Sequence, residues 1–221
     1  MVGTSANPLQ HIRITLLPCI NYIPQCLPFA SCWLTDGCFE GSLEYVDRLL
    51  DWCHAYGLSV LFDIHTLKDS QNGFDNSGQA MGFKWTTALN AEYVDQVSFE
   101  HWPIRTARWM GDFDQETATY TSINRGNIQH ALDVIQEIVD RYGGHPAVLG
   151  LEPVNEPWQY TPMDELKKFY WEGYLIVKRG APYWKYVMHD SFRFDPNIWG
   201  GFMDGYVTRD LYFSLGGSIR Y

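Results

Sequence analysis

A glutamate between an asparagine and a proline closes a short apolar run in the second half of the chain. The run is Val148-Leu-Gly-Leu-Glu-Pro-Val-Asn-Glu, so that Asn155, Glu156 and Pro157 stand at its end. A carboxyl at the rim of a buried strand is partly desolvated, which favours its protonated form near neutral pH. Such a group can protonate the leaving oxygen of a glycosidic bond, and Asn155 can hydrogen-bond a sugar hydroxyl or the carboxylate.

Two other segments place polar side chains directly after apolar runs. Asp63-Ile-His65 is followed by Ser70-Gln-Asn-Gly-Phe-Asp-Asn-Ser-Gly78, and His189-Asp190 follows a later run. Because tripeptides recur by chance, Asn-Glu-Pro alone would favour an ordinary ion pair at a strand end. The nine-residue segment is far more specific than the tripeptide.

Four short, largely apolar runs predict strands buried on both faces of a parallel sheet: residues 11–17, 58–65, 148–156 and 184–189. Helical periodicity lies between them. Two amphipathic faces, ended by Gly57 and by Gly143-Gly144, predict two helices. Their members are Leu43, Val46, Leu50 and Cys53 in the first, and Ile128, Leu132, Ile135, Ile138 or Val139, and Tyr142 in the second.

The clearest predicted helix covers residues 161–179. Thr161 is a suitable N-cap, Pro162 suits the first helical position, and Asp164 takes the capping-box position. Lys178 and Arg179 face the negative end of the helix dipole, and Gly180 is expected to form a left-handed cap.

Strands and helices that alternate in this order predict right-handed βαβ units around a parallel sheet. A long insert, residues 66–124, follows the C-terminal end of the second predicted strand. That end of a parallel sheet carries binding and catalytic loops. We find no internal repeat and no linker, so residues 1–221 are interpreted as one domain.

The Asn-Glu-Pro strand end, the Asp-x-His strand and Ser-Gln-Asn-Gly-Phe-Asp-Asn-Ser-Gly together resemble exo-β-1,3-glucanases of glycoside hydrolase family 5. The resemblance covers roughly residues 40 to 200. It implies a (β/α)8 TIM barrel, incomplete in this chain, with about strands 2 to 6 present. It also implies a β-glucan or oligosaccharide substrate, no cofactor, and a site of action outside the cell or in the cell wall.

The resemblance also implies residue roles. Glu156 matches the acid/base, and Asn155 matches the neighbour that binds the 2-hydroxyl. The matched substrate-binding positions are His65 on the pocket floor, Phe74, Asp75 and Asn76 around the terminal glucose, His189 with Asp190 at a strand end, and Arg13, matched to an arginine beside the nucleophile. Trp158 is expected either to form an aromatic wall at a neighbouring subsite or to pack in the core.

The nucleophile of the family is a glutamate on its seventh strand, and we find no matching strand between Glu156 and Tyr221. We therefore interpret the chain as a fragment and expect little hydrolysis from residues 1–221 alone. The alternative is an inactive β-glucan-binding or decoy protein that keeps the glucose pocket. Oligomeric state and glucan linkage stay open at this point.

Composition limits the other function classes. The formal net charge is −10, from 26 acidic and 16 basic residues, and opposes binding to nucleic acid. Aromatic residues make up 16% of the chain, which suits a carbohydrate binder. The seven histidines form no recognised metal motif, and the five cysteines match no common zinc pattern. No signal peptide and no membrane span are recognised in the chain.

Overall fold

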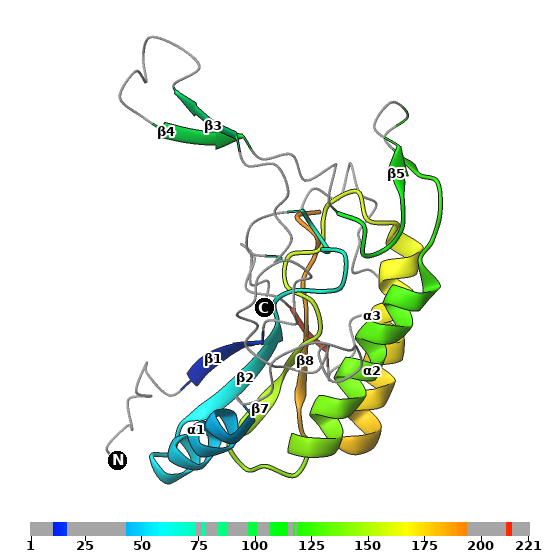
Figure 1. The fold of residues 1–221 in the computed structure, drawn as a ribbon. Coiled ribbons are helices and arrows are strands. Elements are labelled where there is room, and N and C mark those ends of the chain that lie inside the picture. The colour runs from blue at the N-terminus through cyan, green and yellow to red at the C-terminus, as the bar shows by residue number, and fades with distance from the viewer. Residues whose placement is uncertain are drawn as a thin grey trace, which may run out of the picture.

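The computed structural model describes residues 43–73, 77, 107–114, 117 and 119–193, and the backbone of four further strands at 11–16, 84–87, 97–100 and 211–213. Figure 1 shows the arrangement of the elements. In chain order they are β1 (His11–Leu16), α1 (Leu43–Ala55), β2 (Ser59–Ile64), β3 (Lys84–Thr87), β4 (Val97–Glu100), β5 (Phe113–Asp114), β6 (Thr119–Tyr120), α2 (Arg125–Tyr142), β7 (Val148–Glu152), α3 (Met163–Gly180), β8 (Lys185–Met188) and β9 (Leu211–Phe213).

The main sheet has the strand order β1-β2-β7-β8-β9, and each neighbouring pair runs parallel. Parallel strands require crossover connections, and helices supply them here between β1 and β2, β2 and β7, and β7 and β8. The predicted α/β organisation with a parallel sheet is therefore confirmed. It places the loops after β2, β7 and β8 at one edge of the sheet.

The first helix ends as its glycine predicts. Gly57 has a φ of 68°, the left-handed conformation that glycine adopts without penalty. The Gly57 N–H donates to the carbonyl of His54 at 3.1 Å, and the Leu58 N–H donates to that of Cys53 at 2.7 Å. This pair of bonds satisfies the last carbonyls of α1 and turns the chain directly into β2.

Helices α2 and α3 lie side by side and cover one face of the sheet (Figure 1). The sheet presents Phe62, Leu151 and Tyr186 as neighbours in register, and all three are buried in the same core cluster as the inner faces of the helices. The side-chain amide of the α2 N-cap, Asn124, has its oxygen 3.0 Å from the Asn127 N–H, which satisfies one free donor of the first turn.

The limits of α3 differ from the prediction. The helix begins at Met163, with Pro162 as N-cap and no side-chain hydrogen bond to the cap, so the prediction of Thr161 as N-cap was wrong. Gly180 is the last helical residue, and the C-cap is Ala181 at a φ of −139°, which is not left-handed. A Cβ on Gly180 would lie 2.3 Å from Cγ1 of Val139. The glycine therefore permits close packing against α2 rather than forming a turn.

The strand predicted over residues 148–156 is also shorter than expected. β7 ends at Glu152, and residues 153–156 form bends beyond it. Glu156 thus stands in the loop after the strand, at a φ of 45°. The extended conformation predicted for this stretch does not apply to it.

The described residues of the insert after β2 include two antiparallel pairs, β3 with β4 and β5 with β6. Tyr120 of β6 packs against the main core cluster, and its hydroxyl donates to the carbonyl of Ala107 at 3.2 Å. The second hairpin is therefore joined to the body of the fold.

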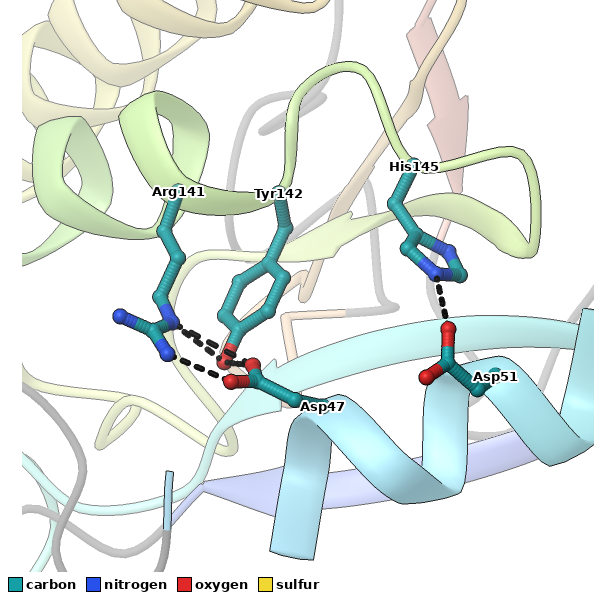
Figure 2. Close-up of polar contacts among 5 residues, drawn as sticks. All are labelled: Asp47, Asp51, Arg141, Tyr142 and His145. Atoms are coloured by element: carbon teal, nitrogen blue, oxygen red, sulfur yellow. Dashed lines mark hydrogen bonds and ion pairs between the residues drawn. The ribbon is translucent and has the colours of Figure 1, made fainter. Parts of the chain in front are cut away.

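A polar network fastens α1 to the end of α2 and the loop that follows it (Figure 2). The Arg141 guanidinium lies 2.6 Å from the Asp47 carboxylate, and the Tyr142 hydroxyl donates to the same carboxylate at 2.8 Å. Nearby, Nε2 of His145 lies 3.7 Å from Asp51. Burial on its own would raise the pKa of Asp47, but the hydrogen bonds from Arg141 and Tyr142 outweigh it and lower that pKa.

Candidate active site

Glu156 lies in the loop after β7, partly buried, with a left-handed backbone. A non-glycine residue in that conformation costs about 1–2 kcal/mol, so neighbouring contacts must hold it. The following Pro157 restricts the backbone of Glu156 further. Asn155, directly before it, is buried, and its N–H donates to the carbonyl of Ile64 at the end of β2 at 3.0 Å.

The loop after β2 holds the loop after β7 through side-chain amides. Nε2 of Gln71 donates to the carbonyls of His65 and Asn155, each at 2.8 Å. Nδ2 of Asn72 donates to the carbonyl of Glu156 at 2.8 Å. The Trp158 N–H donates to the carbonyl of Gln71 at 3.1 Å. The segment from 155 to 158 is thus bonded to the neighbouring loop at three points along its length.

His65 stands one residue beyond β2, and its Nδ1 lies 2.7 Å from Oδ2 of Asp63. The Asp63 side chain is fully buried, whereas that of His65 is 21% exposed. An aspartate beside Nδ1 fixes the ring orientation and the proton on that nitrogen. The other ring nitrogen, Nε2, is then available to bond a further group, such as a ligand hydroxyl.

His189 follows β8 and is buried, and its ring and its backbone carbonyl both accept hydrogen bonds. Its Nδ1 accepts the Ser191 N–H at 3.0 Å, and its carbonyl accepts the Tyr170 hydroxyl at 2.9 Å. Burial, together with the nearby charge of Glu152, raises the pKa of Tyr170 well above its ordinary value, so that its hydroxyl stays a donor. Because Nδ1 of His189 accepts a hydrogen bond, the proton of the neutral ring belongs on Nε2.

The turn after His189 is tight. Ser191 and Phe192 have φ values of 57° and 59°, and the Asp190 carboxylate accepts the Phe192 N–H at 2.9 Å. The Phe192 ring lies 4.9 Å from the His189 ring, between centroids. This turn holds the imidazole at the same edge of the sheet as the loop that carries Glu156.

Trp158 is only 5% exposed and packs edge-to-face against Phe113 of β5 and against Tyr160, with ring centroids 4.7 Å and 4.9 Å away. These contacts correspond to the core-packing alternative for Trp158. The ring next to it that reaches solvent is Tyr160, at 42% exposure. The position of Trp158 in the sequence does not decide between a subsite wall and core packing, because its burial depends on Phe113, which is distant in the chain.

Arg193, after β8, bonds the backbone of the turn that follows Trp158. It is 5% exposed, and its guanidinium donates to the carbonyl of Gln159 at 2.9 and 2.6 Å and also to the carbonyl of Thr161. Burial lowers the pKa of Arg193 to about 10. The arginine therefore ties the turn after β8 to the turn that precedes α3.

The structure brings Glu156, Asn155 and Trp158 to one loop and joins that loop to the one that carries His65. It places His189 at the end of the neighbouring strand β8. Phe74, Asp75 and Asn76 lie outside the described residues. For Arg13 the description covers the backbone, which is paired in register with Leu61 of β2.

Three residues whose side chains bond the backbone of the site loops were assigned no role from the sequence. They are Gln71, Asn72 and Arg193. Gln71 and Asn72 stood inside the nine-residue motif, which was the available signal. Arg193 stood in no motif, and nothing in its sequence neighbours indicates that it binds two carbonyls 32 and 34 residues earlier.

Two further observations concern the described part of the chain. No three histidine, cysteine, aspartate or glutamate side chains within it come together as a set of metal ligands. None of its helices combines the length and apolar character that crossing a membrane would need.

No protein family model matches the chain. It is similar, however, to curated fungal proteins. It is 30% identical over 168 residues to a glucan 1,3-beta-glucosidase of Yarrowia lipolytica, an alignment that covers 74% of this chain and 31% of that protein. It is 31% identical over 167 residues to a glucan 1,3-beta-glucosidase of Blumeria graminis, covering 75% of this chain and 30% of that one.

The chain spans about a third of the length of the curated relatives it matches. The similarity supports a glycosidase family.

Among solved structures, the chain is similar in fold to an endoglucanase from Pseudomonas stutzeri. The match covers 92% of this chain and 47% of the endoglucanase chain, with a TM-score of 0.50 and 11% sequence identity. At this identity the likeness concerns the fold alone. The structural neighbours are TIM-barrel glycosidases, and the parallel sheet described here is consistent with part of such a barrel.

Proposed function

We propose that the protein is a glycoside hydrolase of the family 5 type that cleaves β-1,3-glucan by a retaining mechanism with two carboxyl groups. Similarity to glucan 1,3-beta-glucosidases over three quarters of the chain supports the substrate class. The observation that carries the proposal is the placement of a partly buried glutamate, Glu156, in the loop after one parallel strand and bonded to the loop after its neighbour.

In this mechanism Glu156 protonates the glycosidic oxygen as the bond to the leaving sugar breaks. A second carboxylate attacks the anomeric carbon and forms a covalent glycosyl-enzyme. Glu156 then removes a proton from water, which releases the sugar with its configuration retained. His65 and Asn155 are proposed to bind hydroxyl groups of the sugar. Phe74, Asp75 and Asn76 are proposed to contact the terminal glucose, His189 to contribute from its strand end, and Arg13 to lie beside the nucleophile.

The nucleophile is proposed to lie outside the described residues. Asp63 and Glu152 are register partners near the ends of β2 and β7, but their exposures are 0% and 1%. In retaining enzymes the two carboxyl groups stand about 5–5.5 Å apart on either side of the sugar. A carboxylate enclosed within the sheet does not offer the access that attack on a sugar requires.

The proposal is tested with the longest product of the gene that encodes this chain, on glucans linked β-1,3, β-1,4 and β-1,6. We expect glucose from the β-1,3 polymer, released first as the β-anomer in a proton NMR time course. Release of the α-anomer would contradict the retaining mechanism. Binding of β-1,3 oligosaccharides without any hydrolysis would instead favour the carbohydrate-binding alternative.

A further inference from the structure

The buried amide of Gln71 uses both of its polar atoms within the loops of the candidate site. Its side chain is 1% exposed, and its nitrogen donates to the carbonyls of His65 and Asn155 at 2.8 Å. Its oxygen lies 3.0 Å from the donating Leu67 N–H. A primary amide has two N–H donors, so these two carbonyls saturate them. One side chain thus fixes the loop after β2 and the residue directly before Glu156.

Asn72 acts on Glu156 itself. Its side chain is fully buried, and its nitrogen donates to the Glu156 carbonyl at 2.8 Å. That carbonyl belongs to the peptide bond between Glu156 and Pro157, and proline offers no N–H by which this peptide could be held. The amide of Asn72 therefore orients a peptide unit that cannot donate a hydrogen bond of its own.

The backbone of Glu156 requires such support. Its φ of 45° is unfavourable for a residue with a Cβ, and it recurs in folded proteins where surrounding contacts over-determine it. The contacts here come from the neighbouring loop: Gln71 bonds at residue 155, Asn72 at 156, and the Gln71 carbonyl accepts the Trp158 N–H. The left-handed bend decides the direction in which the Glu156 side chain leaves the loop.

We propose that Gln71 and Asn72 are positioning residues for proton transfer: by bonding the backbone on either side of Glu156, they hold its carboxyl in the direction from which it reaches the glycosidic oxygen. This inference rests on the proposed role of Glu156. Misplacement of a catalytic group by about 1 Å can cost about 100-fold in rate. Both amides therefore affect catalysis without touching the reacting atoms.

The test replaces Asn72 by leucine, which is similar in size and forms no hydrogen bond. Asn127→Leu is the matched control, because the Asn127 amide is also buried and donates to Asp69 of the same loop at 2.8 Å. The control removes a buried side-chain hydrogen bond of the same loop whose acceptor is Asp69 rather than a residue of the 155–158 segment.

The first measurement is hydrogen–deuterium exchange on the 221-residue chain. We expect Asn72→Leu to speed exchange of the Asn155 and Trp158 amides about tenfold or more relative to Asn127→Leu. Equal exchange at these amides in the two variants would overturn the inference, because the loop would then hold its shape without the amide.

The second measurement is kinetic, on the longest gene product. A glucan needs its leaving oxygen protonated, whereas 2,4-dinitrophenyl β-glucoside releases a stable anion without an acid. We expect Asn72→Leu to lower kcat on glucan about 100-fold with KM little changed, whereas the rate at which the aryl glucoside forms the glycosyl-enzyme, measured as the burst of dinitrophenolate, should be little changed. A similar loss on both substrates, or none, would overturn the inference.

A wild-type product inactive on glucan would contradict the proposed function instead. The exchange comparison would then decide whether the amides of Gln71 and Asn72 hold the loop.

Discussion

The Nδ1 atom of His65 lies 2.7 Å from Oδ2 of Asp63, a carboxylate with no exposed surface. The two side chains stand two residues apart at the end of β2, so they share a face of the strand. The aspartate belongs to the interior of the sheet and the histidine to its edge. This pair connects the buried part of the sheet with the candidate site.

This pairing predicts that Nδ1 of His65 carries a proton in the native protein. Asp63→Asn replaces a carboxylate acceptor by a neutral amide and should reduce protonation of that nitrogen. Nitrogen chemical shifts of the imidazole report its protonation directly. A wild-type His65 ring protonated on Nε2 alone would contradict the assignment.

Acid should weaken the junction between α1 and α2. The pKa of Asp47 is lowered in the folded chain, so its contribution is present above the pKa of the unfolded chain and is lost as pH falls through the folded value. Because the Asp47 side chain is 43% exposed, the contribution should be at most about 1 kcal/mol. Asp47→Asn should therefore be less stable than wild type at pH 7 and converge with it below about pH 4.

The matched control for this junction is Asp133→Asn. Asp133 accepts a hydrogen bond from Gln129 of its own helix, at 2.8 Å, rather than from another element. Urea unfolding at several pH values separates the two variants. A stability difference for Asp47→Asn that stays constant from pH 7 to pH 3 would show that the junction does not depend on this carboxylate.

Gly180 should not tolerate a methyl group. A Cβ there would lie 2.3 Å from Cγ1 of Val139, and valine side chains adjust poorly because they are branched at Cβ. Overpacking costs about 1–3 kcal/mol, which exceeds the helix propensity of about 1 kcal/mol that alanine gains over glycine. Gly180→Ala should therefore lower the free energy of unfolding.

Gly144→Ala serves as the control for Gly180, since a Cβ at Gly144 meets nothing within 4 Å. Thermal unfolding of both variants gives the comparison. Equal Tm values for Gly180→Ala and wild type would mean that α2 and α3 move apart at no cost.

Arg193 should be required for the turn before α3. Removing its guanidinium in Arg193→Met leaves the carbonyls of Gln159 and Thr161 without these donors, at a cost of about 1–3 kcal/mol each when buried. Arg193→Lys should recover only part of the loss, because an ammonium lacks the planar fork of donors. Arg179→Met, at an exposed position of α3, is the control in denaturant unfolding.

The sequence predicted the parallel α/β sheet because apolar runs and helical faces alternate clearly along it. The ends of elements were harder to predict. Thr161 and Gly180 are residue types that cap helices, but at Gly180 the deciding influence was contact with Val139, which is distant in the chain. Similarly, β7 stops at Glu152, whereas the apolar run continues to Val154.

In the candidate site, too, local sequence patterns predicted some residues, whereas contacts with distant residues determine others. Glu156 and His65 follow apolar runs, and this local pattern selected them only together with the resemblance carried by the nine-residue segment. The functions of Gln71 and Asn72 depend on partners 84 residues away, which a pattern within one segment does not reveal. Trp158 was ambiguous because its burial depends on Phe113 of a hairpin in the long insert.

Glu156 is proposed as the acid/base, and chemical rescue of a variant without its carboxyl tests that role. In the longest gene product, Glu156→Ala should lose about 100- to 10,000-fold in kcat on β-1,3-glucan, because a general acid contributes about that factor. On 2,4-dinitrophenyl β-glucoside the variant should still form the glycosyl-enzyme, and azide should accelerate turnover and yield β-glucosyl azide. Hydrolysis of the glucan at the wild-type rate by Glu156→Ala, with no azide adduct, would show that Glu156 is not the acid/base.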